Sequence, residues 1–153
     1  MGPEVKFQEL NMVIEGTDAL YHEAARRLGV SDAEMSILYM LYENGDGFSQ
    51  KKLYQQTGIS KTTINSSVKK MESEGYIKLI KSSNDARNTE IFTTAKGKEL
   101  LDRTAAKIVE IENAIYDSWT KEEIQMVIAL NRKYMEDFAE RIKDLGKKDE
   151  TDN

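Results

Sequence analysis

The sequence predicts a mainly α-helical protein with a small β-hairpin wing: a winged helix-turn-helix with long helices at both ends. Three observations predict this fold. A short helix, a glycine turn and a second capped helix follow one another over residues 49–75. Two strand-like segments separated by turn residues come next, over residues 76–93. Apolar residues at alternating spacings of three and four recur in the segments at both ends of the chain.

The second helix of this unit is predicted from its cap and its inner face. The Ser60 hydroxyl can accept from the first free amides of the helix, and Gly75 suits a left-handed stop. Ile64, Val68 and Met71 stand four and three residues apart, so they form one buried stripe. The rest of the helix carries small polar and basic side chains, among them Lys61, Thr62, Asn65, Ser66, Lys69 and Lys70.

The segments around this helix complete the predicted unit. Residues 49–57 read as the preceding helix, ended by Gly58. Residues 76–81 and 89–93 have strand character, and residues 82–85 between them are typical of a turn. The tip of this hairpin therefore presents Lys81, Arg87 and Asn88 beside the second helix.

These side chains suit double-stranded DNA. Short hydroxyl and amide groups near a helix start can bind base edges in the major groove, while lysines suit phosphates. An arginine at a hairpin tip can enter a narrow A·T minor groove. Taken alone, the helix could equally be an ordinary solvated face. The predicted DNA-binding residues are Ser60, Lys61, Thr62, Thr63, Asn65, Ser66, Lys69, Lys70, Lys81, Asp85, Arg87 and Asn88.

The distribution of charge favours the DNA-binding interpretation. The 153-residue chain has a net charge of −5. Residues 48–98 nevertheless contain ten Lys or Arg and four acidic residues, whereas the remainder contains 12 basic and 23 acidic residues. A basic segment on an acidic body is the electrostatic pattern of a nucleic-acid-binding surface.

Composition limits the other possibilities. With no cysteine and one histidine, the chain lacks the usual ligands of a transition-metal site, and we expect no metal and no cofactor. No apolar run is long enough to span a membrane and no signal-peptide core is present, so we expect a cytoplasmic protein without membrane contact. No nucleophile and base pattern or phosphate-binding glycine loop indicates an enzyme.

The terminal helices predict a homodimer. Residues 4–30 carry an apolar seam, as do residues 98–145, and one helix is expected from Thr94 to about Ser118. Capping boxes are expected at Ser31 and Thr120. We therefore expect a single domain over residues 1–153, with residues 31–97 as the winged helix-turn-helix and residues 146–153 as a disordered tail. A two-fold dimer would bind a pseudo-palindromic operator.

Three local motifs make the chain resemble the MarR family of bacterial transcription regulators. They are Asp-x-Arg at residues 85–87, Thr-x-x-Gly at residues 94–97, and Thr-x-Glu-Glu beginning at Thr120. The resemblance implies that Asp85 tethers the wing and that Arg87 reaches the minor groove. It also implies regulation by a small ligand, of aromatic or phenolic type, bound near the dimer helices. Candidate pocket residues are Met12, Tyr21, His22, Met35, Tyr39 and Trp119.

The predicted function is therefore a dimeric, sequence-specific DNA-binding regulator, a repressor relieved by a small molecule. The alternative is a winged helix used as a protein-interaction module, because a fold does not dictate a function. The basic segment and the polar second helix argue against this alternative.

Overall fold

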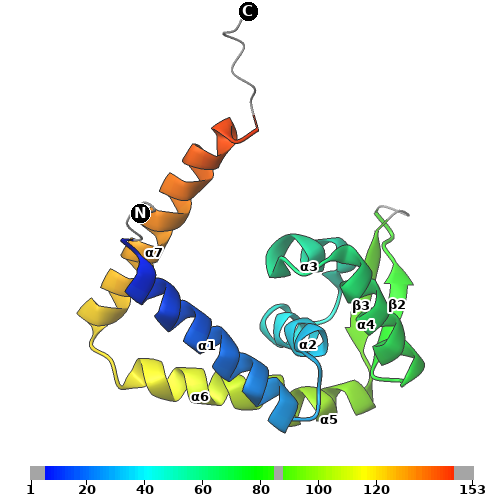
Figure 1. Cartoon of the computed structure of the whole chain (residues 1–153). Coiled ribbons are helices and arrows are strands. Elements are labelled where there is room, and N and C mark those ends of the chain that lie inside the picture. The colour runs from blue at the N-terminus through cyan, green and yellow to red at the C-terminus, as the bar shows by residue number, and fades with distance from the viewer. Residues whose placement is uncertain (1–5, 85–87, 147–153) are drawn as a thin grey trace, which may run out of the picture. The chain divides into compact units, whose positions relative to one another are not determined.

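The computed structural model describes residues 6–84 and 88–146 (Figure 1). The chain forms two compact units, Met1–Glu110 and Ile111–Asn153, which are described separately. The first unit contains, in order, α1 (Gln8–Arg27), α2 (Asp32–Asn44), β1 (Phe48–Ser49), α3 (Gln50–Thr57), α4 (Lys61–Ser73), β2 (Ile77–Lys81), β3 (Thr89–Thr93), α5 (Ala95–Arg103) and the start of α6 (Ala105–Asp117). The second unit contains the rest of α6, then α7 (Lys121–Arg141) and a short 3₁₀ helix (Ile142–Asp144).

The core of the first unit lies between α2, α3, α4 and the small sheet. Ile37, Leu53, Ile64, Val68 and Ile91 are fully buried there, each with 0% of its surface exposed. The predicted inner stripe of the second helix is therefore confirmed, and Met71 completes it. Since the stripe fixes one face of α4, its opposite face is left to solvent.

The predicted helix caps are confirmed at their N-termini. At Ser31 and at Thr120 the hydroxyl accepts from the third backbone amide of the helix, and the glutamate at that position accepts from the cap's own amide. Ser60 likewise accepts from the backbone amide of Thr63. Each cap satisfies amides that the first helical turn leaves without a partner.

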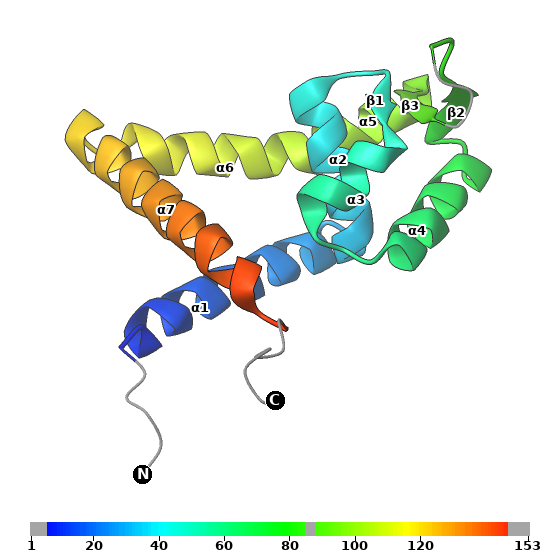
Figure 2. The ribbon, with the colours of Figure 1, turned by 90° about the horizontal axis from the view of Figure 1, so that it is seen from above.

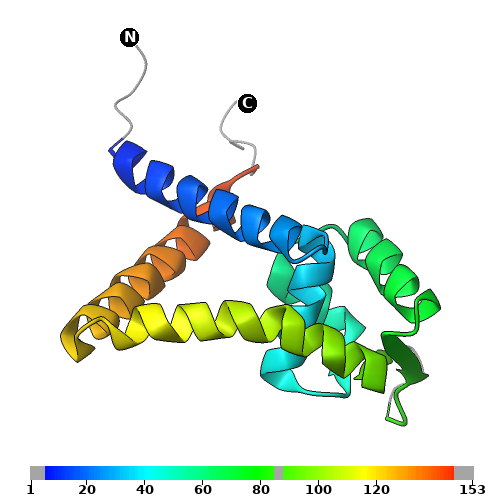
Figure 3. The same cartoon turned by 90° about the horizontal axis from the view of Figure 1, so that it is seen from below.

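The hairpin is confirmed, and a third strand joins it. The strand order is β1-β3-β2, all antiparallel, with Phe48 opposite Ile91 and Leu79 opposite the same residue on the other side. Figure 3 shows the hairpin at the edge of this unit, beside α4. β1 was not predictable from the sequence, because a two-residue strand has too few side chains to show an alternating pattern.

The helix expected from Thr94 to about Ser118 is wrong in one respect: it is divided at Thr104 into α5 and α6. Thr104 has φ −125° and ψ −89°, outside the helical range. Its fully buried hydroxyl donates to the carbonyl of Leu100 at 2.5 Å. A threonine hydroxyl that bonds back to the preceding turn competes with the backbone and bends helices.

Both units expose apolar side chains. On α1, Met12 and Leu20 are 66% and 70% exposed. On α7 no residue is buried, and Met126 and Leu130 are 63% and 61% exposed. None of the helices in residues 6–84 and 88–146 is both long enough and apolar enough to cross a membrane.

Candidate nucleic-acid interface

The helix-turn-helix consists of α3, a short turn and α4 (Figure 2). Gly58 ends α3 with a φ of 66°, a left-handed conformation that glycine adopts without steric strain. Ile59 packs against the core, and Ser60 then caps α4. The turn thus fixes where the first residues of α4 emerge.

The exposed face of α4 is polar and basic. Successive residues of an α-helix are turned by about 100°, so Thr62, Asn65, Ser66 and Lys69 lie on one side, opposite the buried stripe. Thr62, Ser66 and Lys69 are exposed, and Asn65 is half-buried. These four side chains place hydrogen-bonding groups near the start of the helix and a cation farther along it. This arrangement suits a helix that contacts base edges in the major groove of DNA.

Some of the predicted hydroxyl groups already have intramolecular partners. The hydroxyls of Ser60 and Thr63 lie 2.8 Å apart, and Ser60 is also the cap. The Ser66 hydroxyl donates to the carbonyl of Thr62 at 3.0 Å. The Ser66 oxygen keeps both lone pairs, which can accept from a base or a water, whereas the Ser60 oxygen already accepts from the Thr63 amide.

Asn65 is held by two side chains of α3 that the sequence analysis did not single out. Gln50 Nε2 donates to Asn65 Oδ1 at 2.8 Å, and the Tyr54 hydroxyl donates to the same oxygen at 2.6 Å. Burial raises the pKa of the Tyr54 phenol, so its hydroxyl keeps the proton that it donates. The spacing of four residues between Gln50 and Tyr54 was the available signal, because it puts both on one side of α3.

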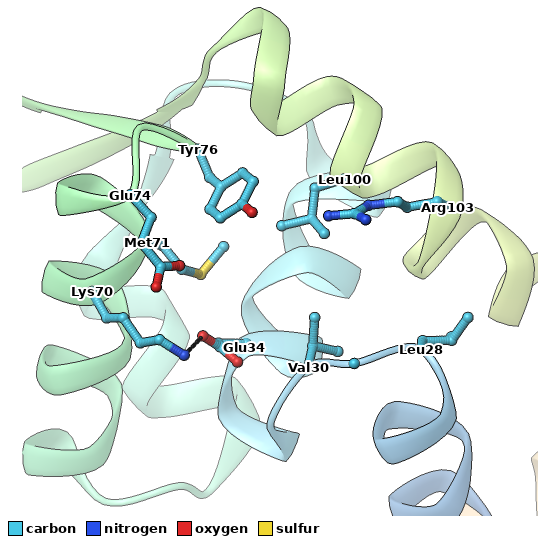
Figure 4. A pocket seen from close by; sticks show the side chains of 10 residues that line it. Leu28, Val30, Glu34, Lys70, Met71, Glu74, Tyr76, Leu100 and Arg103 are labelled. Carbon is cyan, nitrogen blue, oxygen red and sulfur yellow. Dashed lines mark hydrogen bonds and ion pairs between the residues drawn. The ribbon is translucent and has the colours of Figure 1, made fainter.

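Lys70 does not share the outward face with its neighbour Lys69. Its ammonium lies 2.7 Å from a carboxylate oxygen of Glu34 on α2 (Figure 4). The other oxygen of Glu34 accepts from the Ser31 amide in the capping box. Burial raises the pKa of Glu34, but the bonds from Lys70 and Ser31 outweigh it and hold that pKa below its usual value. The bond to Glu34 in turn raises the pKa of Lys70.

This ion pair connects α4 to α2, so we expect Glu34→Gln to destabilise the folded chain by about 1 kcal/mol. A lowered carboxyl pKa stabilises the fold above the unfolded-state value of about 4.3, and this contribution is lost as the pH falls through the folded-state value. The difference in urea midpoint between wild type and variant should therefore be full at neutral pH and disappear under acid conditions. Glu72→Gln is the control, because Glu72 is on α4, the helix that carries Lys70. A difference in urea midpoint between wild type and Glu34→Gln that stays the same in acid would contradict this explanation.

The wing is described except at residues 85–87. Lys81 at the end of β2 is exposed. The amide oxygen of Asn88 accepts from the Ser49 hydroxyl at 2.8 Å, which connects the hairpin to the start of α3. The predicted residues Asp85 and Arg87 lie outside the described residues.

The candidate ligand-binding residues of the first unit differ in their exposure and in their contacts. His22 Nδ1 lies 2.8 Å from the Asp32 carboxylate, which ties the end of α1 to the start of α2. Met35 is buried and Tyr39 half-buried against Ala25 and Ile108. Met12 and Tyr21 are exposed on α1, and Trp119 belongs to the second unit.

A cavity of about 280 Å³ lies elsewhere in the first unit (Figure 4). Its lining comes from α2, α4, α5 and the segments next to them, including Glu34, Lys70, Tyr76 and Arg103. Within the described ranges, no three His, Asp or Glu side chains come together where they could hold a metal ion.

Comparison with known proteins agrees with this geometry. Residues 28–88 match the MarR family. The HTH-type transcriptional regulator YybA of Bacillus subtilis is 27% identical over 145 residues, which are 93% of this chain and 96% of the relative. Both sequences are thus alike over nearly their full lengths.

Two solved structures share the fold. The PcaV transcriptional regulator of Streptomyces coelicolor, in complex with its natural ligand, superimposes with a TM-score of 0.64 at 14% identity, over 89% of this chain and 98% of that one. A mutant of S. aureus MepR bound to an oligodeoxyribonucleotide gives a TM-score of 0.51 at 18% identity, over 88% and 99%.

The family match covers the helix-turn-helix and the first strand of the wing, the B. subtilis relative extends the similarity to almost the whole chain, and α4 carries an exposed polar face. Residues 28–88 therefore match the MarR family, and nearly the full length of the chain is similar to an HTH-type transcriptional regulator.

Proposed function

We propose that the chain is a homodimeric repressor that binds a pseudo-palindromic double-stranded operator and is released by a small-molecule ligand. The observation that carries the proposal is the exposed face of α4. There Thr62, Asn65 and Ser66 present hydrogen-bonding groups beside Lys69, on a helix whose opposite face is buried in the core.

In this proposal α4 enters the major groove and its polar side chains contact base edges. Lys61 and Lys69 contact phosphates on either side. Lys70 contributes less than they do, because its ammonium already pairs with Glu34. The wing supplies Lys81 and Asn88, together with Asp85 and Arg87 in the roles that the family motif gives them. The oligodeoxyribonucleotide bound to the MepR mutant supports DNA as the partner.

The dimer is supported by the apolar side chains that each unit leaves exposed. On α1 they include Met12 and Leu20, and on α7 they include Met126, Leu130 and Met135, all more than 60% exposed. Exposed apolar patches of this kind mark sites of association. Two-fold pairing of two such chains would present two α4 helices to half-sites that are related by the same symmetry.

Ligand control is supported by the PcaV structure, which holds a natural ligand. We place the ligand near the contact of α1 with α2, where His22 and Asp32 pair and where Met35 and Tyr39 lie close by. Met12 and Tyr21 on α1 are the remaining candidates of this site in the first unit. A thermal-shift screen of small aromatic acids should find a compound that raises the Tm of the chain and also weakens its binding to DNA. If no compound that binds changes DNA affinity, the ligand part of the proposal fails.

Two substitutions on α4 test the division between bases and phosphates. We expect Lys69→Ala to weaken binding to every DNA sequence alike and to lower the salt slope by about one. Thr62→Ala should instead change the preference for one base and leave non-specific affinity nearly unchanged. Fluorescence anisotropy with selected and shuffled duplexes measures both effects.

Lys133→Ala on α7 is the control, since it removes a cation far along the chain from α4. Equal behaviour of Lys69→Ala, Thr62→Ala and this control would contradict the proposed interface. It would favour a winged helix that binds another protein instead.

A further inference from the structure

Both lone pairs of the Asn65 side-chain oxygen are occupied by the protein itself. Gln50 Nε2 donates to Oδ1 at 2.8 Å and the Tyr54 hydroxyl donates at 2.6 Å. A carbonyl oxygen has two acceptor positions, so Oδ1 has no further capacity for a base. Among the described residues, the structure records no partner for the Nδ2 amide group.

The two donors are held in place by their helix. Gln50 begins α3 and Tyr54 follows it by one turn, and both are at most half-exposed. The Tyr54 ring packs against the core beside Leu53. The Lys61 ammonium lies over this ring, 5.6 Å from its centre. The Asn65 amide is therefore oriented before DNA arrives, with its oxygen toward α3 and its NH₂ group away from it.

We infer that Asn65 acts on DNA as a hydrogen-bond donor only, and that Gln50 and Tyr54 are the positioning residues that impose this role. The inference rests on the proposed function and adds the chemistry of one base position. Guanine presents two acceptors, N7 and O6, to the major groove, which match the two hydrogens of Nδ2.

Adenine is the base that this arrangement disfavours. Asparagine normally binds adenine in a bidentate manner, accepting from N6 and donating to N7. Here the accepting half of that pair is already used, so the adenine N6 donor would meet an occupied oxygen. The position facing Asn65 should therefore be guanine, although an isolated asparagine on a recognition helix would suggest adenine.

The test is selection of bound duplexes from a randomised library by the full-length protein. Wild type should enrich guanine at one position of each half-site, and Asn65→Ala should erase that preference. The double variant Gln50→Ala/Tyr54→Phe frees Oδ1 without changing Asn65. It should shift the same position from guanine to adenine, by about tenfold in relative affinity.

Gln56→Ala/Tyr42→Phe is the matched control, because it makes the same two side-chain changes at exposed positions outside this cluster. It should leave the selected sequence unchanged. Circular dichroism melting of each variant establishes that it is folded. A merely structural role of Gln50 and Tyr54 would lower affinity without changing which base is preferred.

Three results would overturn the inference while leaving DNA binding intact. In the first, wild type selects adenine at the position whose preference Asn65→Ala removes. In the second, Asn65→Ala changes the preference at no position. In the third, the double variant Gln50→Ala/Tyr54→Phe still selects guanine. If wild type enriches no sequence at all, the proposed sequence-specific function fails, and the inference fails with it.

Discussion

Gly97→Ala is expected to destabilise the first unit by about 3 kcal/mol, more than alanine at any other glycine that the structure describes. A Cβ atom at Gly97 would lie 2.0 Å from the backbone oxygen of Tyr76. That oxygen cannot retreat easily, because it accepts from both the amide and the hydroxyl of Thr94. Thr94 also caps α5, so the clash would disturb the helix start and the strand together.

Urea unfolding of the full-length chain, followed by circular dichroism, measures this effect. Gly16→Ala is the control, since Gly16 is in the middle of α1 and has no atom within 4 Å of the added Cβ. This control should gain up to about 1 kcal/mol, because alanine favours helix over glycine. Equal stability of Gly97→Ala and wild type would show that α5 does not approach Tyr76 as closely as described.

The double substitution Met126→Glu/Leu130→Glu is expected to convert the proposed dimer into a monomer. The two side chains are one turn apart on α7 and are 63% and 61% exposed in the single chain. If they meet a second copy, four carboxylates would be buried at the interface, and burying unpaired charge is prohibitive. Loss of the second half-site contact should then weaken operator binding by about 100-fold or more.

Light scattering should give twice 17.5 kDa for wild type and 17.5 kDa for this variant. The control is Gln125→Glu/Ala129→Glu, which adds the same two charges to the side of α7 that carries Arg132. This control variant should remain dimeric. A wild-type monomer, or a variant that stays dimeric, would show that this side of α7 does not form the interface.

Features that depend on nearby residues were predictable from the sequence. The capping boxes at Ser31 and Thr120 each need only four consecutive residues, and both are present. The buried stripe of α4 follows from helical spacing alone. The wing strands follow from strand-forming residues on either side of a turn.

Features that depend on distant residues were not predictable. β1 depends on the pairing of Phe48 with Ile91, and the exposed Lys70 side chain turns toward α2 because it pairs with Glu34, which is 36 residues earlier in the chain. The backbone leaves the helical range at Thr104, and no local pattern reveals this break. The site was therefore foreseen as a list of residues on α4, whereas the hydrogen bonds that orient them come from α2 and α3.

The central claim is that the exposed face of α4 and the wing bind a particular DNA sequence. The most direct measurement is the affinity of the full-length protein for its own upstream region and for a shuffled duplex, over a series of salt concentrations. The claim predicts that the upstream region binds about 10³-fold tighter or more, and that both affinities fall steeply as salt rises. Equal affinity for the two duplexes, or no salt-dependent binding to either, would contradict it.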